Sequence, residues 1–216
     1  MKKTIAIALI PVVALALSAC TTGVGGADYD KTHADVVKAS FQAKRIAKLD
    51  YPNQDEANRL CSAADVAGKP LDEKAAKVIE AAELKTVKMP SDGKFLGDWK
   101  EGEKIAQSGR GLTWSDKAGA ANGGNCYNCH QISKEEISFG TLGPSLYNYG
   151  KLRGVTDPNS AGGKAIVEYT WGKLWNARAY NACSQMPRVG HMAILNQKQI
   201  QDVMALLLDP ASPVNK

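Results

Sequence analysis

The chain has 216 residues, of which 44% are hydrophobic and 23% are charged, and its formal net charge is +5. This composition is typical of a globular protein, and it excludes an intrinsically disordered chain, a collagen-like chain and a multi-span membrane protein. Two lysines at positions 2 and 3 account for part of the charge, and the basic residues of the remaining chain are too few and too scattered to indicate a nucleic-acid partner.

Residues 1–19 have the pattern of a signal peptide. Two lysines open it, and the apolar run over 4–19 is too short and too close to the start for a membrane span. The stretch Leu-Ser-Ala-Cys, which ends at Cys20, resembles a bacterial lipobox, whose cysteine becomes the lipidated first residue of the mature protein. We therefore expect a periplasmic protein, anchored to a membrane through a lipid on Cys20. A plain secretory signal with an incidental Cys20 is the alternative.

Residues 20–96 are expected to form a helical N-terminal extension. A glycine-rich tether occupies 21–26, and apolar residues then recur at helical spacing in two segments. The two predicted faces consist of Val36, Ala39, Ala43, Ile46 and Ala47, and of Leu71, Ala75, Val78, Ile79 and Ala82. Because few of these side chains are large, we expect the extension to pack against the rest of the chain, pinned through Cys61, instead of forming its own core. A mobile spacer is the alternative.

Residues 97–112 are expected to form a helix with Asp98 as its N-cap and a glycine-rich exit. A second helix is expected over Gln197 to Leu208, capped by Asn196 and stopped by a following proline. Met204 lies within this second helix, where a methionine usually fills core space. These patterns predict an all-α fold.

Residues 126–130 read Cys-Tyr-Asn-Cys-His, the C-x-x-C-H pattern of covalent haem c attachment. Cys126 and Cys129, on one turn at the start of a helix, can bond the two vinyl groups of a haem, and His130 is then held where its imidazole ligates the iron. A thioredoxin-like pair lacks the preceding strand that it requires, and a zinc site lacks nearby ligands. The single motif predicts one haem c.

The chain contains five cysteines, an odd number that is informative in an exported protein. If Cys20 takes a lipid and Cys126 and Cys129 take a haem, Cys61 and Cys183 remain. We expect these two to form a disulfide, because disulfides persist outside the cytoplasm. Two separate buried thiols are the alternative.

Two further segments resemble elements of class I cytochromes c. The stretch Thr-Leu-Gly-Pro-Ser-Leu resembles the G-P-x-L element, so the resemblance gives Pro144 the carbonyl that accepts a hydrogen bond from the proximal histidine; an ordinary turn is the alternative. Met186 is followed by proline, as in the ligand loop of that class, and is the expected sixth iron ligand, with His191 as its rival. Together these imply a class I cytochrome c domain over 97–216. Candidate residues lining its haem pocket are Trp99, Ile105, Ile132, Leu142, Leu146, Tyr149, Trp171, Trp175, Tyr180 and Leu206.

Several motifs, in the same order, are similar to SoxX, the monohaem subunit of the SoxAX cytochrome of bacterial sulfur oxidation. They lie at 123–130, 140–146, 149–154, 183–188 and 207–216. The resemblance covers about residues 97–216. It departs from the family at the lipobox, and at Val189, where an aromatic residue is expected after Met-Pro-Arg.

The SoxX resemblance implies an electron-transfer subunit without catalytic residues of its own. Its partner would be a SoxA-like subunit, with which it forms a heterodimer that couples thiosulfate to a cysteine of the carrier protein SoxYZ, an L-cysteine S-thiosulfotransferase type of reaction. The chemistry would lie in SoxA, and this chain would pass electrons to a downstream cytochrome. The alternatives are a stand-alone periplasmic monohaem shuttle of another respiratory pathway, and a haem enzyme or ligand sensor, against which Met186 argues because it would close the sixth position.

Overall fold

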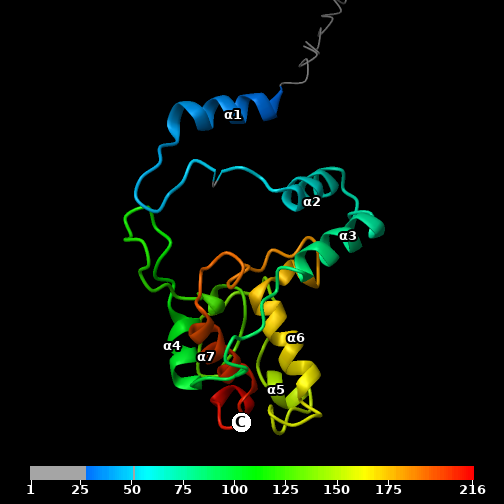
Figure 1. Cartoon of the computed structure of the whole chain (residues 1–216), viewed down its shortest axis with the longest axis vertical. Coiled ribbons are helices and arrows are strands. Elements are labelled where there is room, and N and C mark those ends of the chain that lie inside the picture. Colours follow the sequence, from blue (N-terminus) through cyan, green and yellow to red (C-terminus); the bar gives the residue numbers. More distant parts are fainter. Residues whose placement is uncertain (1–27, 51) are drawn as a thin grey trace, which may run out of the picture. The chain divides into compact units, whose positions relative to one another are not determined.

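The computed structural model describes residues 28–50 and 52–216. The described chain divides into two units, one that ends at Phe41 and one over Gln42–Lys216 (Figure 1). The second unit holds all the residues of the candidate site other than Cys20. The expected signal peptide, the lipidation site and the tether lie outside the described residues.

The described part of the chain contains seven α-helices, three short 3-10 turns and no β-strand. The fold is therefore all-α, as the sequence predicts. None of these helices is both long enough and apolar enough to cross a bilayer.

Helix α1 (Tyr29–Ser40) begins at Asp28, whose side chain accepts a hydrogen bond of 2.9 Å from the backbone N–H of Lys31. The expected helical face from Val36 to Ala47 is only partly correct, because α1 ends at Ser40. The following residues form an isolated bridge between Lys44 and Ala47, in which Arg45 has a φ of 53°. This left-handed conformation is incompatible with a continuing right-handed helix.

Helices α4 (Trp99–Gln107) and α7 (Gln197–Leu208) pack against each other in the second unit (Figure 1). Asp98 and Asn196 cap them as predicted, and α7 has the predicted bounds. The first of the two helices stops before the predicted end at 112, because Ser108 already adopts an extended backbone with φ −81° and ψ 120°.

The close contact between α4 and α7 depends on Gly102. A Cβ at this position would lie 2.1 Å from the backbone carbonyl oxygen of Asp202. Every residue from Ile200 to Leu208 is buried, and Met204 is fully buried, which agrees with its expected role as core filling. Helix α7 is therefore the centre of the main core.

Helices α5 (Tyr149–Leu152) and α6 (Lys164–Trp175) complete the main core. Trp171 is fully buried, lies edge-on to Phe95 at 5.7 Å between ring centroids, and donates through its indole N–H to the carbonyl oxygen of Lys88 at 2.8 Å. This bond satisfies the one polar group of the largest buried side chain.

Helices α2 (Glu56–Val66) and α3 (Glu73–Leu84) form a smaller second cluster with the loop after α6. Its buried members are Ala57, Ile79 and Ala182, with Leu60, Leu71 and Ala76 partly buried around them. The face predicted for α3 is partly wrong, because Val78 and Ala82 are exposed. Glu80 and Glu83 occupy the packed face instead, and apolar periodicity does not detect charged side chains.

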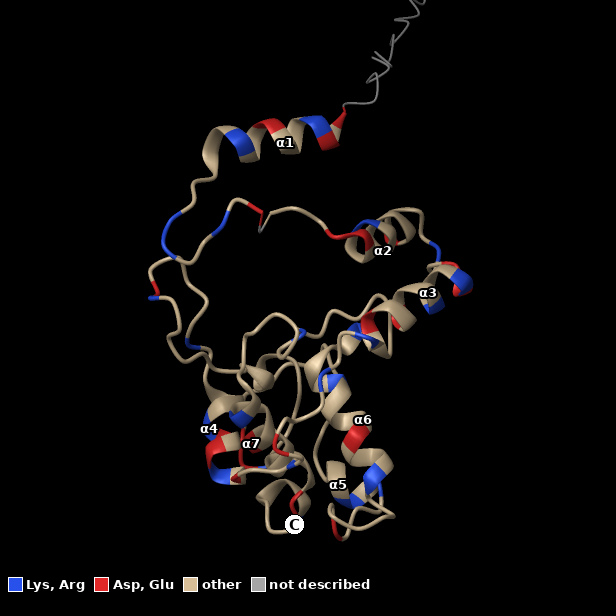
Figure 2. Cartoon of the chain, viewed as in Figure 1, with Lys and Arg blue, Asp and Glu red and all other residues tan. Residues whose placement is uncertain are grey.

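Acidic and basic residues are both present on α1, α2, α3, α4, α6 and α7 (Figure 2). Each of these helices carries both signs, so none presents the uniformly basic stripe that binds a nucleic-acid backbone.

Candidate functional site

The C-x-x-C-H segment forms a single 3-10 turn, η1 (Cys126–Asn128). The backbone N–H groups of Cys129 and His130 both donate to the carbonyl oxygen of Cys126, at 3.1 and 3.0 Å. Both cysteines therefore lie on one turn, and His130 follows directly. The helix expected to start here is absent from the described chain, since 131–148 consists of loops and turns.

The loop after η1 explains why no helix follows. The backbone N–H of Gly140 donates to the carbonyl of Tyr127 at 2.7 Å, and that of Gly143 donates to the carbonyl of Cys129 at 2.8 Å. These carbonyls accept hydrogen bonds from a returning loop, which satisfies them without an α-helix along the chain. The result is a loop folded back over the motif.

His130 is fixed from two sides by this returning loop. Its Nδ1 lies 2.7 Å from the carbonyl oxygen of Pro144, the contact that the class I resemblance assigns to these residues. A Cβ at Gly143 would lie 2.1 Å from Cε1 of the imidazole, so only glycine fits against the ring. With Nδ1 donating to a carbonyl, Nε2 is the nitrogen that can ligate a metal.

The turn η1 contacts the end of α4 through two glycines. The N–H of Gly124 donates to the carbonyl of Ile105 at 2.8 Å. A Cβ at Gly123 would lie 1.9 Å from the carbonyl oxygen of Ser108, and one at Gly124 would lie 3.1 Å from Sγ of Cys126. The Gly-Gly pair therefore lets the motif approach the helix end closely.

Cys126 and Cys129 are both unpaired thiols and both partly buried. Burial raises the pKa of the Cys126 thiol to about 12, so this thiol is neutral at physiological pH. Cys126 also packs against the main core. Two thiols on one turn, an apolar wall and an oriented imidazole are the groups that covalent attachment and ligation of a haem require, so the residues fit the cofactor.

Met186 is partly buried and packs against the same core cluster as Cys126. The other methionines and His191 have different environments. Met204 is fully buried in α7, Met89 and Met192 are 55% and 54% exposed, and His191 is exposed. Met186 is thus the one described methionine that combines a loop position with contact to the core.

Eight of the ten predicted pocket-lining residues belong to the main core or pack against it. Leu142 does not, and it lies in the returning loop with 90% of its surface exposed. Tyr180 packs outside the cluster, edge-on to Tyr169 at 4.9 Å between ring centroids.

Glu103 of α4 accepts a hydrogen bond of 2.8 Å from the hydroxyl of Tyr127, inside the C-x-x-C-H motif. Its second carboxylate oxygen is buried, and no described residue donates to it. Burial raises the pKa of Glu103, the Tyr127 bond lowers it, and the nearby acidic Glu135 and Glu136 raise it, with a net increase. Burial likewise raises the pKa of Tyr127.

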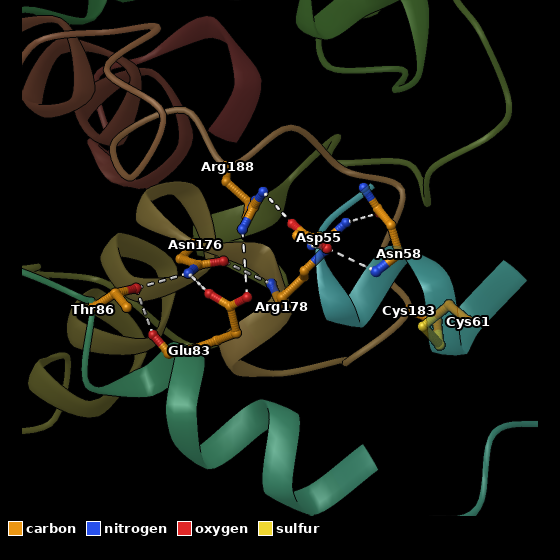
Figure 3. Close-up of polar contacts among 9 residues, drawn as sticks. All are labelled: Asp55, Asn58, Cys61, Glu83, Thr86, Asn176, Arg178, Cys183 and Arg188. Carbon is orange, nitrogen blue, oxygen red and sulfur yellow. Dashed lines mark hydrogen bonds and ion pairs between the residues drawn. A yellow bond between two sulfur atoms is a disulfide. The ribbon is translucent and has the colours of Figure 1, made fainter. Parts of the chain in front are cut away.

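Cys61 and Cys183 are joined by the expected disulfide, with 5.6 Å between their Cα atoms (Figure 3). Beside it, Arg178 pairs with Asp55 at 2.8 Å and also donates to the side chain of Asn58. Arg188 pairs with the same carboxylate at 3.1 Å. The disulfide and ion pairs link the start of α2 to the segment around Met186.

Asp55 is also the N-cap of α2 and accepts a hydrogen bond of 2.8 Å from the N–H of Asn58. Partial burial pushes the pKa of Asp55 up, but this bond and the guanidinium groups of Arg178 and Arg188 outweigh burial, so the pKa lies below its ordinary value. The carboxylate is therefore ionised at neutral pH.

The sequence alone did not point to Glu103, Asp55 or Arg188, or to the ion pair between Arg178 and Asp55. Asp-Glu before a helical segment is an N-cap signal that could have found Asp55. The partners of the two arginines lie more than 100 residues away along the chain, so no local pattern reveals them. In residues 28–50 and 52–216, no three His, Cys, Asp or Glu side chains are grouped so as to hold a bare metal ion.

The chain matches no known protein family. The chain is similar to a lipoprotein of Aquifex aeolicus (strain VF5). That protein is described as an uncharacterized lipoprotein, and the two sequences are 36% identical over 132 residues. The aligned region covers 61% of this chain and 59% of the length of the relative.

Proposed function

We propose that this protein is a monohaem c-type cytochrome that transfers electrons. The observation that carries the proposal is the state of His130, whose Nδ1 is bonded to Pro144 and whose ring packs on Gly143. An imidazole oriented in this way, directly after a turn that carries two cysteines, suits the proximal ligand of a covalently attached haem.

Each residue has a defined part in this proposal. Cys126 and Cys129 would form the two thioether bonds, His130 would ligate iron through Nε2, and Met186 would supply its sulfur as the sixth ligand. A bound haem supplies reversible one-electron transfer at its iron. With a haem bound, Met186 would fill the remaining coordination position, which would favour electron transfer over substrate binding at the metal, and the apolar core around Cys126 would exclude water. The class I cytochrome c fold is part of the same proposal.

The partner in this proposal is a SoxA-like subunit. The resemblance to SoxX supports it, because five motifs recur in the same order over 97–216. The heterodimer would couple thiosulfate to a carrier cysteine of SoxYZ, with the coupling chemistry in SoxA. This chain would accept electrons from that partner and deliver them to a downstream cytochrome.

The proposed location is the periplasmic side of a membrane, with a lipid anchor on Cys20. The lipobox-like sequence and the name of the Aquifex relative both support an anchored form. An anchor would keep the protein close to membrane-bound electron acceptors while leaving Gln42–Lys216 outside the bilayer.

The test is expression of the full chain in a bacterium that attaches haem c. We expect covalent haem on the denatured protein, a c-type reduced spectrum and, in the oxidised form, the weak far-red band of sulfur-to-iron ligation. A matched variant in which Cys126 and Cys129 are both replaced by Ala should carry no covalent haem. A wild-type chain without covalent haem would overturn the proposal.

Mixing the haem-loaded chain with a SoxA-like subunit then tests the partner. We expect co-elution on gel filtration, and haem reduction that requires both the partner and thiosulfate. A haem that is reduced reversibly without forming any stable complex would instead identify the stand-alone shuttle. Carbon monoxide binding to the native reduced protein would identify a haem enzyme or sensor.

A further inference from the structure

The loop that carries Met186 is held on both sides by residues of α2 and α3. Figure 3 shows the Cys61–Cys183 disulfide and the ion pair of Arg188 with Asp55. Cys183 precedes the methionine in the sequence, and Arg188 follows it. The two helices belong to the extension, which the electron-transfer proposal does not use. The proposed function therefore does not explain why α2 and α3 contact this loop.

The upstream side of the loop has three connections to the extension. The disulfide joins Cys183 to Cys61 of α2. The backbone N–H of Ala182 donates to Oε1 of Glu80 on α3 at 3.1 Å. Ala182 is also 98% buried, in the small cluster with Ala57 and Ile79. The chain therefore enters the loop at a fixed place.

The downstream side is held by Arg188, whose side chain is only 16% exposed. One guanidinium nitrogen lies 3.1 Å from Oδ2 of Asp55, and the other lies 3.4 Å from Oε1 of Glu83. The side chain of Glu83 is 15% exposed, and its second carboxylate oxygen accepts a hydrogen bond of 2.7 Å from the side-chain amide nitrogen of Asn176. Arg178 shares Asp55, so two arginines and two carboxylates balance in charge.

We propose that α2 and α3, with Asp55, form a brace that positions the thioether of Met186 for iron ligation. This inference rests on the proposed function. A methionine side chain is flexible, and a thioether is a soft, neutral ligand, so the loop has to restrict its motion before ligation. Fixing the chain three residues before and two residues after the methionine confines a short loop at both ends. Arg188, Asp55, Glu83 and Cys61 are thus positioning residues.

The experiment uses the full haem-loaded chain and two independent ways of releasing the loop. One variant replaces both Cys61 and Cys183 by Ser, which leaves no extra thiol to react with haem. The other is Arg188→Gln, which removes the ion pairs on the opposite side. Glu73→Gln is the matched control, because Glu73 lies on α3 and pairs only with exposed Lys77.

Both releasing variants should keep covalent haem, lose the far-red band of the oxidised form, and bind carbon monoxide when reduced. The control Glu73→Gln should keep the far-red band and should not bind carbon monoxide. Arg188→Lys should retain part of the band, because an ammonium can still pair with one carboxylate. If the cysteine variant does not fold, as judged by circular dichroism, Arg188→Gln decides alone.

The outcomes separate this inference from the proposed function. A wild-type chain without covalent haem contradicts both the proposed function and the brace. A wild-type chain with haem but no far-red band leaves the cytochrome standing and overturns the brace, since Met186 is then not a ligand. Releasing variants that keep the band and exclude carbon monoxide also overturn the brace.

Discussion

The hydroxyl of Tyr127 donates to Oε1 of Glu103 at 2.8 Å, and this bond joins the C-x-x-C-H turn to α4. Burial, together with neighbouring acidic residues, raises the pKa of Glu103 above the ordinary 4.5 despite the bond. A carboxyl group with a raised folded pKa contributes stability below its unfolded pKa, and this contribution is lost as pH rises through the folded value. The Tyr127 bond reduces that loss because it favours the ionised form.

Tyr127→Phe should therefore destabilise the protein more at neutral than at acid pH. At pH 7 we expect the free energy of unfolding to fall by about 1–2 kcal/mol, because the carboxylate loses the hydrogen bond from Tyr127 and keeps only the one from Gln107. At pH 4 the loss should be smaller. Urea unfolding at both pH values measures it. Tyr147→Phe is the control, since that hydroxyl bonds the backbone of Lys216 at an exposed site; equal losses at both pH values would contradict the prediction.

Gly143→Ala should disturb the ring of His130 without preventing haem attachment. The added Cβ would lie 2.1 Å from Cε1 of the imidazole, so the ring must move and the Nδ1 bond to Pro144 is lost. Covalent haem on Cys126 and Cys129 should remain, while the oxidised and reduced spectra shift. Gly162→Ala is the control, because its Cβ meets only Ser160, at 3.9 Å. Spectra identical to wild type would argue against His130 as the ligand.

Gly102→Ala should separate α4 from α7. Alanine favours a helix over glycine by about 1 kcal/mol, but forcing extra volume into a packed contact costs about 1–3 kcal/mol or more. Because the obstacle is the backbone carbonyl of Asp202, we expect a net loss near the upper end of that range. Thermal unfolding measures it, with Glu101→Ala on the exposed face as the control. A variant at least as stable as wild type would refute the close packing.

Asp55→Asn should destabilise the protein at neutral pH and have little effect in strong acid. The pKa of Asp55 lies below the ordinary 3.8, so its contribution to stability is present above about pH 3.8 and is lost as pH falls through the folded value. Its side chain is 41% exposed, so water screens the pairs with Arg178 and Arg188. We expect a loss of about 1–2 kcal/mol at pH 7, below the cost of breaking a fully buried pair. Urea unfolding of both proteins at pH 7 and pH 3 tests this; a constant difference would contradict it.

The sequence predicted those features that depend on local chemistry. Asp98 and Asn196 begin their helices because each side chain accepts hydrogen bonds from nearby backbone N–H groups. Counting cysteines paired Cys61 with Cys183 although 122 residues separate them. Each of these inferences needs only a short pattern or a small set of alternatives.

Several of the incorrect predictions concern long-range packing. No helix follows His130, because backbone N–H groups of a later loop donate hydrogen bonds to the carbonyl oxygens of the motif. On α3, Glu83 lies on the packed face in place of the expected Ala82, because Arg188 of a distant segment pairs with it. The spacing of apolar residues along a helix carries no information about the distant segment that packs against it.

The order of cysteines along the chain has a consequence for oxidative folding. In the proposed export of the chain with its amino end first, Cys61 emerges before Cys126 and Cys129, and Cys183, the native partner of Cys61, emerges last. A catalyst that oxidises thiols in order of appearance would therefore make non-native bonds. Correct maturation requires either that Cys126 and Cys129 be occupied early or that an isomerase later exchange the mispaired bonds.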